Sequence, residues 1–184
     1  VTLNNIGALY QALNQHEKAL PHLEAVLRAH GSDLEAWHNL ATSYASLGQT
    51  NRAVETYLQV IEKGSSHAPS FFNLGFILSR TQRIPEAVNY FERAIAADPG
   101  YGPPYYSLGH LYARAGDLKT AEDLFARLLV INPARADAQH AIAVVYARQN
   151  RLDLAIPHCR EALRLNPAFD EARRNLEQML KGQP

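Results

Sequence analysis

Asparagine side chains recur at a fixed spacing near the start of this chain. Asn5, Asn39 and Asn73 are each separated by 34 residues. A carboxamide offers one acceptor oxygen and two N–H donors, so it can pair with both the C=O and the N–H group of an extended peptide backbone. A row of such side chains could hold a peptide without reading its side chains. The alternative is that each asparagine hydrogen-bonds a neighbouring helix.

The asparagines belong to a repeat that fills most of the sequence. Similar segments start every 34 residues, and they read LNNIGALY, WHNLATSY, FFNLGFIL, YYSLGHLY and QHAIAVVY, from Leu3, Trp37, Phe71, Tyr105 and Gln139. Their apolar residues follow the i, i+3, i+4, i+7 spacing of an amphipathic helix. A second helix follows in phase, marked by alanine at Ala19, Ala53, Ala87, Ala121 and Ala155, and then by Leu23, Tyr57, Phe91, Phe125 and Cys159. Each repeat is therefore predicted to be a pair of helices.

The repeat also specifies how the helices join and pack. The predicted turns carry Asn14, Gly48, Gln82, Gly116 and Asn150, and all but the glutamine are types that favour a left-handed C-cap. A small residue stands in every first helix, at Gly7, Ala41, Gly75, Gly109 and Ala143, where it allows close approach. A single pair cannot bury its apolar face alone, so stacked pairs must share a continuous core.

These motifs resemble the tetratricopeptide repeat family. The shared pattern is a large residue, Leu-Gly three and four positions later, then Tyr, Ala, an aromatic residue, Ala and a closing proline, here Pro99, Pro133 and Pro167. The resemblance implies an all-α, right-handed superhelical solenoid that forms a single domain over residues 1–184. Its five repeats would span 1–33, 34–67, 68–101, 102–135 and 136–169, with a capping helix at 170–181. Gln139 and Cys159 depart from the pattern, both in the last repeat.

In this family the first helix of each repeat lines a concave groove, so the resemblance places the asparagines in that groove. The series is similar to the asparagine ladder in the tetratricopeptide region of protein O-linked N-acetylglucosamine transferase. Ring-bearing residues flank it, and we expect Phe72, Phe76, Tyr106 and His110 to form an aromatic patch that binds a partner. Packing between adjacent first helices is the alternative for these rings. The other predicted groove residues are His38 and His140.

Three arginines also recur at the 34-residue spacing, near the ends of first helices. Arg80, Arg114 and Arg148 could bind acidic side chains or a carboxylate of a partner. A cation at that place also offsets the helix dipole, which is the structural alternative.

Catalytic or metal chemistry is a weaker hypothesis. His110, His140 and Asp137 could supply two nitrogens and a carboxylate to a metal, but nothing in the sequence fixes a second shell of partners. We find no nucleophile with a base, no paired carboxylates and no phosphate-binding loop. The prediction is a protein that is not an enzyme and needs no metal or cofactor. An enzyme elsewhere in a longer chain would make this array its substrate-recruiting arm.

Composition narrows the class of partner. The chain has 184 residues, 47% of them hydrophobic, and 18 basic residues balance 18 acidic ones, as in a soluble folded protein. A nucleic-acid binder usually carries a basic face, so we expect a protein or peptide partner rather than nucleic acid or a membrane. Self-association of the chain is the alternative. There is no visible signal peptide and no run of about 18 apolar residues, so the cytoplasm is the default expectation. The chain lacks an initiator methionine, and we expect further segments to have preceded it.

Overall fold

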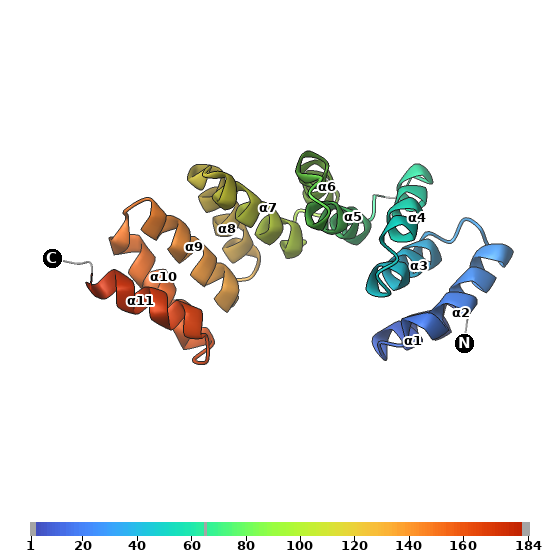
Figure 1. Cartoon of the computed structure of the whole chain (residues 1–184), viewed down its shortest axis with the longest axis horizontal. Helices are drawn as coiled ribbons and strands as arrows, with labels where there is room; N and C mark the ends of the chain where they lie inside the picture. The colour runs from blue at the N-terminus through green and yellow to red at the C-terminus, as the bar shows by residue number, and fades with distance from the viewer. Residues whose placement is uncertain (1–2, 65, 182–184) are drawn as a thin grey trace. The chain divides into compact units, whose positions relative to one another are not determined.

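The computed structural model describes residues 3–64 and 66–181, and every element in that part of the chain is an α-helix (Figure 1). The predicted all-α fold is thus confirmed. Residues 1–2, Ser65 and residues 182–184 lie outside the described residues. The helices are α1 (Leu3–Ala12), α2 (His16–Ala29), α3 (Leu34–Ser46), α4 (Thr50–Glu62), α5 (Ala68–Arg80), α6 (Ile84–Ala97), α7 (Gly102–Ala115), α8 (Leu118–Ile131), α9 (Ala136–Arg148), α10 (Leu152–Leu165) and α11 (Asp170–Lys181).

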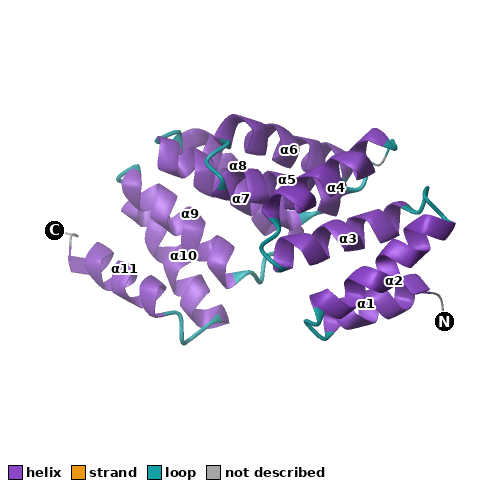
Figure 2. Ribbon diagram, turned by 45° about the vertical axis from the view of Figure 1, so that its right-hand side comes forward, coloured by secondary structure: helices purple, strands orange, loops and turns teal. Residues whose placement is uncertain are grey.

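The chain divides into two compact units. Unit 1 holds α1 to α6 and ends at Asp98, whereas unit 2 begins at Pro99 and holds α7 to α11. Short loops join consecutive helices (Figure 2). Odd-numbered helices from α1 to α9 are the first helices of the five predicted pairs, and each packs against the even-numbered helix that follows it.

One close contact inside each pair determines how near its two helices lie. A Cβ atom added to Gly109 would lie 2.6 Å from the ring of Phe125, and one added to Gly7 would lie 2.6 Å from the side chain of Leu23. The same construction at Gly75 meets the Phe91 ring at 3.0 Å. The remaining two pairs place a buried alanine at this position of the first helix. All five predicted large residues of the second helices are fully buried, including Cys159.

The first residue of the repeat motif tethers its helix to the preceding turn. The indole N–H of Trp37 donates to the carbonyl of Gly31 over 2.9 Å, and the hydroxyl of Tyr105 donates to that of Pro99 over 3.1 Å. Gln139 makes the equivalent bond to Pro133, also over 3.1 Å. It is 9% exposed. The departure from the family pattern at Gln139 therefore preserves the hydrogen bond, because the carboxamide replaces the aromatic donor.

All five predicted turn residues adopt a left-handed conformation. Gly48 and Gly116 have φ angles of 72° and 90°, and Asn14 and Asn150 have 56° and 60°. Gln82 also takes a φ of 63°, although its side chain is exposed and its residue type disfavours this conformation. The short connection between α5 and α6 thus imposes its geometry on an unsuitable residue.

Replacing Gln82 with glycine should stabilise the protein. Glycine adopts positive φ without the steric penalty that a Cβ atom brings, which is worth about 0.5–1 kcal/mol after its greater chain entropy is counted. We expect the free energy of unfolding, measured by urea denaturation, to rise by that amount. Gln82→Ala is the matched control, since alanine keeps the Cβ atom. An equal gain in both variants would contradict the conformational explanation.

Candidate functional site

The predicted partner-binding side chains lie on the first helices of the pairs. In unit 1, α3 contacts both α1 and α5, and in unit 2, α9 contacts both α7 and α11. The first helices of each unit are therefore neighbours. Side chains at corresponding motif positions can act on one ligand within a unit.

The carboxamides of Asn39 and Asn73 are each held by one hydrogen bond to a neighbouring helix. Nδ2 of Asn39 donates to Oδ1 of Asn4 over 3.3 Å, and Nδ2 of Asn73 donates to the hydroxyl of Tyr57 over 3.0 Å. Both asparagines are half-buried. Among the described residues neither amide oxygen has a hydrogen-bond partner. Asn5 is exposed on α1 and has an interaction of its own.

A further asparagine at the same repeat position was missed by the sequence analysis. Asn175 on α11 follows Asn73 by three periods of 34 residues, and the segment RRNLEQML around it continues the motif. Its Nδ2 donates to Nε2 of His140 over 2.9 Å. Asn39 and Asn175 thus both form a hydrogen bond with the side chain 35 residues earlier, which is the second residue of the repeat motif in the preceding first helix. Extending the period beyond residue 169 would have identified this asparagine.

His38 is fixed between helices. Its Nδ1 lies 2.8 Å from Oγ of Ser70, and Nδ1 of His67 lies 3.0 Å from the same hydroxyl. The two imidazole rings meet edge to face at 4.7 Å between centroids. Burial, with a smaller effect from His67, lowers the pKa of His38 from 6.5 to about 4. One ring nitrogen of His38 is thus used in a hydrogen bond that connects α3 to α5.

The aromatic residues in unit 1 divide between core and surface. The ring of Phe72 lies 5.7 Å from that of the buried Phe91 and 6.1 Å from that of Phe76. Phe72 is half-buried, whereas Phe76 is 45% exposed. Phe72 therefore contributes to the packing between helices, as the alternative for these rings expected, but it is not fully buried. Phe76 exposes an apolar ring to the solvent.

The other two predicted rings form a cluster in unit 2. The rings of Tyr106 and His110 lie 4.4 Å apart, and His110 also meets Phe125 at 5.2 Å. The guanidinium of Arg135 lies 4.8 Å above the Tyr106 ring. Burial lowers the pKa of His110, although the charge of Asp137 opposes that shift. At neutral pH this surface is aromatic with an uncharged histidine.

The prediction that His140 faces a partner was wrong. This side chain is 6% exposed, because α11 covers it. Its ring lies 4.8 Å from that of Phe169, and Asn175 occupies its Nε2. Burial lowers the pKa of His140, with Glu171 opposing the shift.

The three recurring arginines are exposed, but they do not behave alike. Nη1 of Arg148 donates to the carbonyl of Ala113 over 2.6 Å, at the end of α7. This contact fits the alternative in which an arginine satisfies a helix C-terminus. In the described part of the chain, Arg80 and Arg114 have no hydrogen bond or ion pair. Of the three, these two remain available to a partner.

Each unit has a pocket along its first helices. In unit 1 a pocket of about 340 Å³ is lined by the ends of α3 and α5, with Phe76, Ile77 and Arg80 among its residues. In unit 2 a pocket of about 280 Å³ lies between α9 and α11. A larger one of about 580 Å³ is lined by Leu34, Glu35 and His67, beside the loop between α4 and α5.

The residues of the metal hypothesis have other partners. Asp137 accepts two hydrogen bonds from Arg135, at 2.8 and 3.0 Å, and His140 is held by Asn175. No group of three potential ligands comes together within residues 3–64 and 66–181.

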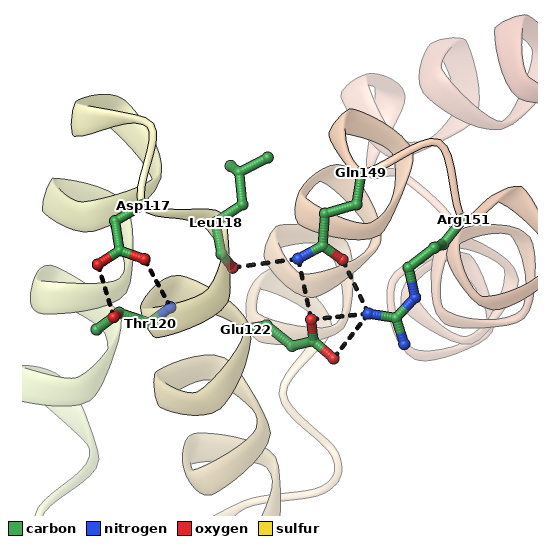
Figure 3. Close-up of polar contacts among 6 residues, drawn as sticks. All are labelled: Asp117, Leu118, Thr120, Glu122, Gln149 and Arg151. Atoms are coloured by element: carbon green, nitrogen blue, oxygen red, sulfur yellow. Dashed lines mark hydrogen bonds and ion pairs between the residues drawn. The ribbon is translucent and has the colours of Figure 1, made fainter.

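In unit 2 a cluster of polar side chains joins α8 to the turn between α9 and α10 (Figure 3). The carboxylate of Glu122 accepts hydrogen bonds from Gln149 at 3.0 Å and from Arg151 at 2.8 Å. Partial burial raises the pKa of Glu122, but these hydrogen bonds outweigh it and lower the pKa below its usual range. The cluster fixes α8 against the turn between α9 and α10, and so supports the position of α9.

Comparison with known proteins agrees with this architecture. Models of the tetratricopeptide repeat match residues 1–64, 38–102, 80–145 and 136–169, which together span residues 1–169. The chain belongs to the tetratricopeptide repeat family, whose members expose extended binding surfaces for other proteins. A comparison with curated proteins gives no match.

Several solved structures share the fold. YrrB, described as a TPR protein with an unusual peptide-binding site, is 22% identical with a TM-score of 0.76, over 95% of this chain and 90% of that one. MamA from Desulfovibrio magneticus RS-1 is 21% identical with a TM-score of 0.76, over 91% and 95%. A thermophilic TPR protein from Thermus thermophilus, TTC0263, is 24% identical with a TM-score of 0.67, over 97% of each chain. At these identities the likeness concerns the fold alone.

Among the described residues, no helix combines the length and the apolar character that crossing a bilayer requires.

The burial of His38 should make the stability of the protein depend on pH. Its folded-state pKa of about 4 lies below the ordinary 6.5, so between these values the unfolded chain binds a proton that the folded chain does not. This contribution is complete above pH 6.5 and is lost as the pH falls toward 4. We expect the free energy of unfolding to decrease by on the order of 2 kcal/mol over that range.

Urea denaturation at a series of pH values measures this dependence. His38→Gln should make this dependence shallower by the share that His38 contributes, while the same change at the exposed His30 serves as the control. Identical slopes for the wild type and His38→Gln would show that His38 titrates normally in the folded protein.

Proposed function

We propose that this protein is a non-catalytic scaffold that binds an extended peptide segment of a partner protein along its first helices. In unit 1 the peptide main chain pairs with Asn39 and Asn73. The apolar side chains of the peptide contact Phe76 and the pocket beside it. The carboxamide geometry carries this proposal.

Each of the two asparagines is oriented by the protein before any ligand arrives. One N–H is used by Asn4 or by Tyr57, and this bond fixes the plane of the carboxamide. The amide oxygen and the second N–H then remain for a ligand, which is the pair of groups that a peptide unit complements. Because the side chains are already ordered, little rotamer entropy is lost when the peptide binds.

Apolar contacts and charge supply the specificity that a carboxamide row lacks. Phe76 and Ile77 line the pocket in unit 1 together with Arg80, whose guanidinium has no ion pair among the described residues. This combination favours an apolar side chain of the peptide next to an acidic one. In unit 2, Tyr106 and His110 offer a separate aromatic surface, and Arg114 a second available cation.

The proposal is tested with a phage-displayed library of random extended peptides, selected on the wild-type protein. Selected peptides should bind Asn39→Ala/Asn73→Ala about tenfold more weakly or worse, because each lost hydrogen bond is worth about 0.5–1.5 kcal/mol. Fluorescence anisotropy of a labelled peptide measures the affinity. Phe76→Ala should weaken binding independently of the asparagines.

Asn51→Ala/Asn89→Ala is the matched control. These asparagines are exposed on the second helices α4 and α6, so the same chemical change there should leave the affinity intact. If no peptide is enriched, or if both double variants bind equally well, the proposed groove is not the binding site.

Self-association is a second candidate function, favoured by two exposed leucines, one on α1 and one in the turn that follows it. Leu9 is 60% exposed and Leu13 is 57% exposed. A second copy of the chain could bury these two leucines against its own apolar surface.

Sedimentation over a range of concentrations distinguishes this candidate. Self-association through α1 predicts a mass that rises with concentration above the 20.5 kDa of the monomer, and Leu9→Ser/Leu13→Ser should abolish the rise. A wild-type mass that stays at the monomer value would exclude it.

A further inference from the structure

α11 continues the row of first helices in unit 2. It contacts α9, as α9 contacts α7, and its segment RRNLEQML carries the repeat motif in phase. Arg173 stands at the position of Trp37, Tyr105 and Gln139, and it likewise donates to the carbonyl six residues before it, that of Pro167. α11 therefore occupies the place of a first helix. Its Asn175, at the motif position of Asn39 and Asn73, lies next to α9.

A pocket of about 280 Å³ lies between these two helices. Val144 and Ala147 of α9 line it, and Met179 and Asn175 line it from α11, with Arg148 and Gln178 completing the lining. Met179 is buried, whereas Val144, Ala147 and Asn175 are half-buried. The pocket thus combines an apolar lining with carboxamide groups.

The carboxamide of Asn175 is oriented by one hydrogen bond to a buried side chain, as that of Asn73 is in unit 1. Its Nδ2 donates to Nε2 of His140 over 2.9 Å, and His140 is itself buried against Phe169. Within the described residues, the amide oxygen and the second N–H of Asn175 have no hydrogen-bond partner. Asn39 is held in the same way by the side chain 35 residues before it.

We infer that the pocket between α9 and α11 is a second peptide subsite, in which Asn175 pairs with the main chain of an extended segment and one apolar side chain of that segment fills the pocket. This inference rests on the proposed function and extends it to unit 2. It makes α11 part of the binding surface as well as a cover for the last repeat.

The dimensions and charge of the pocket favour a peptide over other ligands. At about 280 Å³ the pocket lies at the lower limit of sites for cofactors and drug-sized ligands, and it is large enough for an apolar side chain. The only charged side chain in its lining, Arg148, already donates to the carbonyl of Ala113. The polar groups left for a ligand are mainly the carboxamides of Asn175 and Gln178, which complement peptide groups.

The sequence provides a separate reporter for each unit. Met179 is the only methionine and Trp37 the only tryptophan of the chain. A protein labelled with ¹³C at the methionine methyl group gives one NMR signal from the pocket in unit 2, and indole fluorescence reports on α3 in unit 1. The probes are peptides from the random library selected on the wild-type protein.

Peptides should shift the Met179 methyl signal in a saturable manner. Asn175→Ala should weaken their binding by about fivefold to tenfold, the value of one hydrogen bond. Since this variant also frees His140, Val144→Phe is the second variant: it fills the pocket, leaves Asn175 in place and should weaken binding at least as much. Asn132→Ala, an exposed asparagine in the same unit, is the matched control and should bind normally.

The outcomes separate this inference from the proposed function. Peptides that lose affinity for Asn39→Ala/Asn73→Ala, yet leave the Met179 signal unmoved and bind Asn175→Ala and Val144→Phe normally, would overturn the subsite alone. Failure to enrich any peptide would overturn both. A Met179 shift with lost affinity in both unit 2 variants, and none in the control, would establish the subsite.

Discussion

The contact between a small residue of the first helix and a large residue of the second governs the whole structure. At Gly109 a single added Cβ atom would lie 2.6 Å from the ring of Phe125, so the ring or the helix would have to shift. Overpacking of this kind typically costs about 1–3 kcal/mol. Because the contact recurs every 34 residues, it sets the same close spacing within successive helix pairs. Residues on the remaining faces of the first helices are then placed at regular intervals, whether or not they contribute to the core.

This regular placement explains why polar side chains can be ordered on an exposed surface. Asn39 reaches Asn4, and Asn175 reaches His140, across the same separation of 35 residues. Each bond orients a carboxamide with a partner that the scaffold supplies, and the other polar groups of the carboxamide stay available. Asn73 instead donates to the hydroxyl of Tyr57, and His38, at the position corresponding to Asn4 and His140, bonds to Ser70 through Nδ1. The two arrangements satisfy the same requirement with different partners.

The sequence predicted the helix pairs, their turns and the core, because those features depend on a period that can be counted. It was less informative about individual surface residues, whose environment depends on the helix beside them. His140 and His110 share a ring chemistry, yet α11 buries the first and leaves the second exposed. Gln139 departs from the family pattern but keeps the hydrogen bond of the aromatic residues it replaces. Asn175 escaped prediction for a different reason, because the closing Pro167 ends the fifth repeat of the family pattern before this position is reached.

α11 differs from the earlier first helices at the position where each of those helices lies closest to its partner. Glu177 stands where every earlier first helix carries glycine or alanine, and its side chain is exposed. A second helix could not approach α11 as α8 approaches α7, because it would bury a carboxylate without a partner and meet a long side chain at the closest point. The same substitution leaves the opposite face of α11 unaffected, where Ala172 and Met179 are buried. Glu177 thus distinguishes α11 from the earlier first helices, while α11 covers the last pair and contributes to the surface beside α9.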